Sequence, residues 1–135
     1  MRVSDELRVP IVNEVDVVEA RRSGRALAAE LGFGLSDQAL IATAISELAR
    51  NILLYARRGE LIIAAAHNGT DNGISVVAVD QGPGIADPER AMQDGFSTGS
   101  GLGLGLPGTR RIMDEFELDT AVGRGTRVAV KKWVP

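Results

Sequence analysis

Hydrophobic residues recur along the chain at two spacings, which divide it into helices and strands. Residues 16–31 and 36–57 repeat apolar side chains every three or four positions, and this spacing predicts a helix in each segment. Gly32 is expected to end the first helix, and Ser36 to cap the second. The second helix has a wide apolar stripe, typical of a helix that faces the core: Leu40, Ile41, Ala44, Ile45, Leu48, Ile52 and Leu53.

Shorter apolar runs rich in β-branched residues predict strands. They cover residues 7–12, 61–66, 74–80, 117–122 and 126–133. The second and third runs, and likewise the fourth and fifth, are separated by glycine-containing turns, which indicates two hairpins. A short helical segment near residues 88–92 and a third helix over residues 104–115 complete the pattern.

The order of these elements favours an α/β fold in two layers. Strands occur in hairpins rather than in regular alternation with helices, so a doubly wound parallel sheet is not expected. We predict a two-layer α/β sandwich with a mixed or antiparallel β-sheet and helices on one face. The length of 135 residues suits a single domain over residues 1–135, since compact domains cluster near about 100–150 residues.

Composition and charge exclude several kinds of site and partner. The net charge of −3 argues against nucleic acid, which binds basic surfaces. The absence of cysteine excludes thiol catalysis and cysteine-bound metals. The first residues are charged, unlike a secretory signal, and we find no apolar run near the roughly 20 residues that a membrane helix needs. We therefore expect a cytoplasmic protein with no membrane partner.

Glycine is the one residue type in clear excess. It occupies 16 of 135 positions, where its usual share is about 7%. Half of these glycines lie between Gly82 and Gly108. Because glycine costs backbone entropy on folding, such a cluster indicates either a flexible surface loop or a backbone that a ligand approaches closely.

The second predicted helix carries a polar group beside its apolar stripe. Glu47, Arg50 and Asn51 lie three and four positions apart and share one helix face. A carboxylate can act as a general base, and the side-chain oxygen of asparagine suits Mg²⁺. The alternative is a surface Glu–Arg pair beside a solvated asparagine.

Asp80 ends an apolar strand and is followed by Gly82 and Gly84. A carboxylate placed there can accept a hydrogen bond from an exocyclic amine such as that of adenine. The alternative is an ordinary strand-ending turn.

The glycine-rich segment 99–108 precedes a predicted helix, so its backbone N–H groups can wrap a phosphate chain. No strand precedes it and no Gly-Lys-Ser/Thr occurs, which excludes a dinucleotide fingerprint and a P-loop. Gly125-Thr126 in the last hairpin offers a hydroxyl and a permissive backbone, although a plain turn explains it as well.

In this order the four motifs resemble the gyrase/histidine-kinase (GHKL) ATPase superfamily, whose nucleotide-binding domain is the Bergerat fold. The motifs are Glu47-x-x-x-Asn51, Asp80-x-Gly82-x-Gly84, the loop 101–105 and Gly125-Thr126. The resemblance spans nearly the whole chain. Within the superfamily, segments 46–52, 103–116 and 125–133 resemble the bacterial stressosome serine/threonine switch-protein kinases of the RsbT type.

The resemblance implies a histidine-kinase-like ATPase domain over residues 1–135 and a role for each motif. Glu47 would be the catalytic base or water-orienting carboxylate, and Asn51 would bind Mg²⁺ bridging the phosphates of ATP. Asp80 would accept from the adenine amino group. The resemblance further assigns nucleotide binding to Gly82, Gly84, Ile85, Gly99, Gly101, Leu102, Gly103, Leu104, Gly105 and Thr126.

The activity implied by the resemblance is ATP-dependent phosphorylation of a serine or threonine on a STAS-domain antagonist or scaffold protein in a stress-signalling partner switch. ATP/ADP and Mg²⁺ would be the cofactors, and the released kinase would activate a phosphatase of the PP2C type. Two alternatives stay open: an anti-sigma factor kinase that sequesters a sigma factor, and a nucleotide-binding interaction module without kinase turnover.

Overall fold

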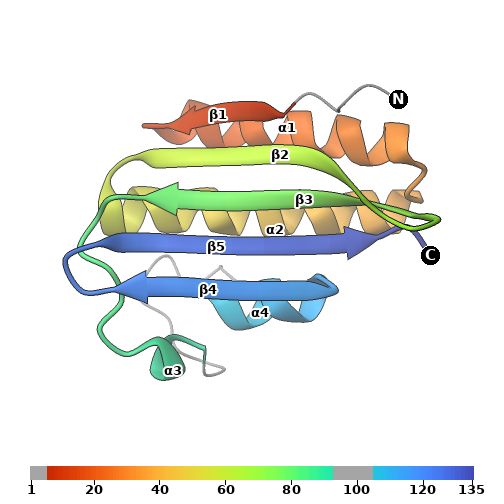
Figure 1. Ribbon diagram of the computed structural model, residues 1–135. Helices are drawn as coiled ribbons and strands as arrows, with labels where there is room; N and C mark the ends of the chain where they lie inside the picture. The colour runs from red at the N-terminus through yellow and green to blue at the C-terminus, as the bar shows by residue number, and fades with distance from the viewer. Residues whose placement is uncertain (1–5, 93–104) are drawn as a thin grey trace.

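The computed structural model describes residues 6–92 and 105–135, which form one β-sheet covered by helices on a single face (Figure 1). The elements in chain order are β1 (Leu7–Ile11), α1 (Glu14–Leu31), α2 (Leu35–Ala56), β2 (Gly59–Asn68), β3 (Asp71–Asp80), α3 (Pro88–Ala91), α4 (Gly105–Ile112), β4 (Glu115–Ala121) and β5 (Gly125–Trp133). The predicted two-layer α/β sandwich is confirmed.

The described strands form a five-stranded sheet in the order β1-β2-β3-β5-β4. Each of its four pairings is antiparallel. This finding selects the antiparallel sheet over the mixed sheet that the sequence also allowed. Because β5 lies between β3 and β4, the end of β3 meets the start of β5, and this junction positions much of the candidate site (Figure 1).

Helix α1 begins earlier than the apolar pattern predicted, because a capping box stabilises its first turn. The Asn13 side chain accepts a hydrogen bond from Asp16 N at 3.2 Å, and Asp16 Oδ2 accepts from Asn13 N at 3.1 Å. Gly32 ends the helix with a φ of 101°, as expected from its position.

Helix α2 begins at Leu35, and the prediction that Ser36 caps it was wrong. The N-cap is Gly34, which offers no side chain to the helix. Ser36 lies inside the first turn, while Gln38 binds the preceding loop by donating from its side chain to Phe33 O at 2.8 Å. The start of α2 is therefore tied to the preceding loop by the side chain of Gln38, which lies inside the helix, and not by an N-cap side chain.

The third predicted helix was too long and the first predicted hairpin turn was too wide. Helix α4 ends at Ile112, whose carbonyl accepts from Lys132 Nζ at 2.9 Å, and Glu115 already belongs to β4. In the first hairpin the ladder continues to the pair Asn68 and Asp71. Tertiary contacts in the first case and strand pairing in the second set these boundaries.

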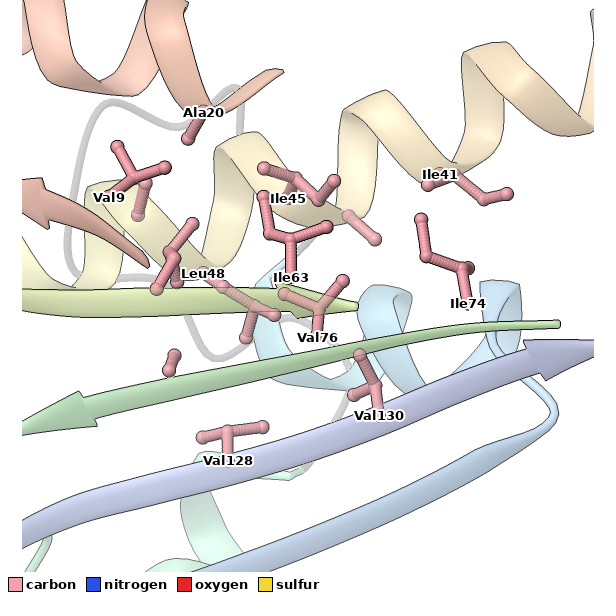
Figure 2. Close-up of a cluster of buried hydrophobic side chains, with 14 of the residues drawn as sticks. Val9, Ala20, Ile41, Ile45, Leu48, Ile63, Ile74, Val76, Val128 and Val130 are labelled. Carbon is pink, nitrogen blue, oxygen red and sulfur yellow. The ribbon is translucent and has the colours of Figure 1, made fainter. Parts of the chain in front are cut away.

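The core lies between the inner face of the sheet and helices α1 and α2 (Figure 2). Fully burying one aliphatic side chain contributes about 1.5–3 kcal/mol, so this layer dominates the stability of the fold. Gly24 lets α1 approach α2, because a Cβ at this position would lie 2.1 Å from Ile45 Cδ1. The side chains that Figure 2 labels are Val9, Ala20, Ile41, Ile45, Leu48, Ile63, Ile74, Val76, Val128 and Val130.

Helix α2 is also long and apolar enough to cross a membrane by length and composition, contrary to the expectation from the sequence. Half of its apolar window is buried inside the fold. Ile41, Ile45, Leu48 and Ile52 belong to the core described above. Packing against the sheet and α1 thus accounts for the apolar face of this helix.

Candidate nucleotide-binding site

Three polar side chains form one row at the end of the sheet. Asp80 of β3 lies opposite Thr126 of β5, which lies opposite Thr120 of β4. Directly opposed residues point to the same face of a sheet, and this row lies on the face that the helices cover. On the other side of Asp80 lies Gly59, where a Cβ would come within 2.9 Å of Ile52 Cγ2 on α2.

Asp80 is held by the turn that follows it. Its Oδ1 accepts a hydrogen bond from Gly82 N at 2.9 Å. Gly82 lies against the last turn of α2, where a Cβ would meet Ala56 Cβ at 2.6 Å. Among the described residues, the second carboxylate oxygen, Oδ2, has no hydrogen-bond donor.

Gly84 and Ile85 join the same end of the sheet to the last hairpin. Gly84 has a φ of 80°, and a Cβ there would lie 2.1 Å from the carbonyl oxygen of Ala121. Ile85 N donates to Thr120 Oγ1 at 2.9 Å. The predicted purine-contacting turn therefore packs on β4, which only a glycine at position 84 permits.

The Thr120 hydroxyl makes two further contacts within the hairpin. Its Oγ1 lies 3.1 Å from Gly125 O and 2.9 Å from Thr126 Oγ1. Gly125 has a φ of 93°, and a Cβ there would lie 2.2 Å from Asp80 O. The sequence motif identified Thr126 as a site residue. It did not identify Thr120, whose hydroxyl contacts Thr126 and helps to position it.

Glu47 is buried in α2 and is bound to the start of α4. Only 7% of its surface is exposed, and Oε2 accepts a hydrogen bond from Gly105 N at 3.2 Å. The first N–H groups of a helix lack partners within the helix, so a carboxylate there is stabilised. A buried carboxylate in turn needs such a donor.

Asn51 lies one turn beyond Glu47 on α2 and is half-buried, whereas Arg50 is exposed. No ion pair joins the described side chains of Glu47 and Arg50, so a surface Glu–Arg pair does not explain this motif. The side-chain oxygen of Asn51 suits Mg²⁺, which proteins commonly hold through few side chains together with substrate phosphates. Among the described residues, no group of three or more Asp, Glu, His or Cys side chains is placed to hold a metal ion.

Tyr55 continues the line of Glu47 and Asn51 along α2 and was not predicted. Burial raises the pKa of its phenol above the ordinary value of 10.0, and the negative charge of Glu47 raises the pKa further. The residue is 48% exposed, so the phenol remains open to solvent. Tyr55 lies four residues after Asn51 and eight after Glu47, so the three positions share one helix face. This spacing is the sequence signal that could have identified Tyr55.

The structure brings the described site residues together in two groups. One group lies at the end of the sheet and contains Asp80, Gly82, Gly84, Ile85 and Thr126. The other lies where α2 meets α4 and contains Glu47, Asn51 and Gly105. Helix α2 connects the groups, because Ile52 and Ala56 contact the glycines beside Asp80. Five predicted site residues lie outside the described residues, and their roles stay predictions: Gly99, Gly101, Leu102, Gly103 and Leu104.

Residues 36–135 match the family of histidine kinase-, DNA gyrase B- and HSP90-like ATPases. The chain belongs to this family. The matched range contains both groups of site residues and all strands except β1. ATP-binding is the shared property of the family, so nucleotide use follows from membership.

Two curated relatives cover most of the chain. The serine/threonine-protein kinase RsbT of Bacillus subtilis is 52% identical over 132 residues, which are 98% of this chain and 99% of that protein. An anti-sigma F factor of Caldanaerobacter subterraneus is 34% identical over 119 residues, 85% of this chain and 83% of that protein. The assignment made from the sequence, to the switch-protein kinases of the superfamily, is confirmed.

Solved structures share the fold. The RsbU and RsbW domains of a Mycobacterium tuberculosis protein match with a TM-score of 0.66 at 21% identity, over 97% of this chain and 33% of that one. The mycobacterial sensor histidine kinase MprB matches with a TM-score of 0.56 at 16% identity, over 97% of both chains.

Proposed function

We propose that this protein is an ATP- and Mg²⁺-dependent protein serine/threonine kinase that phosphorylates a STAS-domain protein in a bacterial partner switch. The observation that carries the proposal is the arrangement on α2. One helix presents the buried Glu47 carboxylate and the Asn51 amide one turn apart, and it also contacts the sheet end that holds Asp80.

Each group has a chemical task in phosphoryl transfer. Asp80 Oδ2 accepts from the amino group of adenine, and Thr126 lies beside it. Gly105 N orients the Glu47 carboxylate through Oε2, which leaves Oε1 to accept the proton of the attacking serine or threonine hydroxyl. Transfer depends mainly on alignment and charge neutralisation, and Mg²⁺ held by Asn51 and the phosphates would supply the positive charge.

The partners follow from the same assignment. The 52% identity to a kinase named RsbT supports a protein substrate, for which we propose a STAS-domain antagonist or scaffold. On release the kinase would activate a PP2C-type phosphatase. The acidic net charge of −3 and the packing of α2 in the core support a cytoplasmic protein without nucleic-acid or membrane partners.

The test is transfer of labelled phosphate from ATP to a cognate STAS protein, with ADP binding measured separately by calorimetry. Wild type should transfer phosphate, and transfer should be strongly reduced in both Glu47→Gln and Asn51→Ala. The control is Glu60→Gln, which changes a half-buried carboxylate on β2 that pairs with Arg8 of β1, away from both groups of site residues. Unchanged transfer by both site variants would contradict the mechanism. ADP binding by a wild type that transfers no phosphate would instead support an interaction module without turnover.

An anti-sigma factor kinase is the second candidate, favoured by the 34% identity to an anti-sigma F factor. It predicts that the ADP-bound protein retains a sigma factor on a column. Retention of a STAS protein but of no sigma factor would support the first candidate.

A further inference from the structure

We propose that Lys132 is a positioning residue for phosphoryl transfer, because it holds helix α4 where Gly105 N–H meets the Glu47 carboxylate. Lys132 acts through α4 and not by contact with the reacting atoms. The inference deepens the proposed function and rests on it, since it concerns the base of that reaction.

Helix α4 has a charged side chain bonded to each of its ends. At its start, Glu47 Oε2 accepts from Gly105 N at 3.2 Å. At its end, Lys132 Nζ donates to Ile112 O at 2.9 Å. The start of a helix carries partial positive charge and its end partial negative charge, so the carboxylate and the ammonium each lie at the favourable end. The eight residues of α4 therefore connect the two charged groups over about 12 Å.

Strand β5 gives this lysine a fixed support, because it is paired on both sides in the sheet. Lys132 lies opposite the buried Ile74 of β3, so its side chain leaves the sheet on the face that the helices cover. Asp114, which follows α4, donates from its N to Lys131 O at 2.9 Å, and its Oδ2 accepts from Trp133 N at 2.8 Å. Three consecutive residues of β5 thus bind the end of α4 and the segment that follows it.

The bond at the start of α4 is sensitive to a small displacement. Its length of 3.2 Å lies at the upper end of the usual range for N–H···O bonds, about 2.7–3.2 Å. The buried Thr109 ties the first turn to the rest of the helix, because its Oγ1 donates to Gly105 O at 3.1 Å. Movement at the end of α4 is therefore passed to Gly105. Loss of the Lys132 bond should move the Gly105 N–H away from Glu47 and leave the carboxylate misdirected.

The experiment measures phosphotransfer kinetics and the ADP dissociation constant for wild type, Lys132→Met and Lys132→Arg. Methionine keeps the apolar stem and removes the donor, whereas arginine restores a cationic donor. We expect kcat to fall by roughly tenfold in Lys132→Met, because a slightly misplaced base slows the transfer, while the ADP dissociation constant stays the same. Lys132→Arg should recover most of the rate. Lys131→Met is the matched control, because this neighbouring side chain is exposed on the other face of β5.

A double variant separates positioning of Glu47 from a merely structural role. If Lys132 acts through Glu47, Lys132→Met should not lower the residual rate of Glu47→Gln any further. A further tenfold or so loss in the double variant would overturn the inference. Lys132→Gln covers the case in which Lys132→Met does not fold. Its uncharged side chain ends one atom short of the lysine nitrogen, and the same fall in kcat is expected.

A second measurement needs no kinase activity. Hydrogen exchange of the Gly105 amide, followed by NMR, reports whether its N–H is bonded. Exchange should be roughly tenfold faster in Lys132→Met than in wild type, and unchanged in Lys131→Met. Equal exchange in wild type and Lys132→Met would show that Lys132 does not hold the Gly105 bond, which refutes the inference.

Failure of the inference and of the proposed function can be told apart. If wild type transfers no phosphate, the proposed function is wrong and, with it, a role of Lys132 in the transfer. If wild type transfers phosphate while Lys132→Met has the same kcat, the kinase stands and only the role of Lys132 is refuted.

Discussion

The Glu47 carboxylate accepts a hydrogen bond at 3.2 Å from the backbone N–H of Gly105, which lies 58 positions later in the chain. The bond joins the expected base on α2 to the first residue of α4. Gly105 has a φ of 66°, a conformation that favours glycine. The orientation of the carboxylate therefore depends on the backbone at the start of α4.

Replacing Glu47 should separate this structural role from catalysis. Glu47→Gln keeps an oxygen for Gly105 N–H but removes the base, so we expect phosphotransfer to fall by about 10²–10⁴-fold with little change in stability. Glu47→Ala leaves the N–H without its acceptor and should cost a further 1–3 kcal/mol or so. Urea unfolding and a transfer assay measure the two effects. Equal stability of the two variants would show that the Gly105 bond contributes nothing.

The titration of Tyr55 should report the charge of Glu47. Because its pKa is raised in the folded state, the unfolded chain loses this proton first. The contribution of Tyr55 to the free energy of unfolding is thus fully present below about pH 10, the pKa in the unfolded chain. It is lost as the pH rises through the higher pKa of the folded state. Glu47→Gln should lower the pKa, while burial still holds it above 10.0.

This tyrosine is the only one in the chain, so its ultraviolet absorbance gives the titration directly. Glu117→Gln, at an exposed position on β4, is the control and should leave the curve unchanged. A Tyr55 titration that is identical in wild type and Glu47→Gln would refute the predicted proximity.

Two glycines of the last turn should respond differently to alanine. Gly123 has a φ of 83° and open space around it, so Gly123→Ala should cost only about 1–2 kcal/mol of backbone strain. Gly125→Ala adds a clash of its Cβ with Asp80 O, 2.2 Å away, and should cost about 1–3 kcal/mol more. It should also weaken ADP binding, because Asp80 must move. Equal losses of stability in the two variants would contradict this account.

Gly24 and Ile45 should be energetically coupled. Glycine to alanine inside a helix normally gains about 1 kcal/mol, but Gly24→Ala should destabilise because its Cβ would meet Ile45 Cδ1 at 2.1 Å. Ile45→Val removes that atom and alone should cost about 0.5–1.5 kcal/mol. In the double variant the alanine should recover its benefit, which gives a coupling of about 1–2 kcal/mol in unfolding experiments. Additive effects would show that α1 shifts away instead.

Most element positions were predictable because their signals are local. The three- and four-residue spacing of apolar side chains located α1 and α2, and the β-branched runs located the strands. The errors occurred where a distant contact decided a boundary. Helix α4 ends early because Lys132 Nζ of β5 donates a hydrogen bond to the Ile112 carbonyl. No residue near Ile112 in the sequence indicates this contact.

By itself the sequence determined the two-layer class, the family and the motif residues, because periodicity and motif spacing are properties of neighbouring positions. Only the tertiary structure decided that the sheet is antiparallel at each described pairing, that Gly105 binds Glu47, and that Thr120 stands between Ile85 and Thr126. The contacts of Glu47 with Gly105 and of Thr120 with Ile85 join positions 58 and 35 apart. Such partners meet only after strand order and helix packing have placed them, so these contacts are properties of the fold and not of the local sequence.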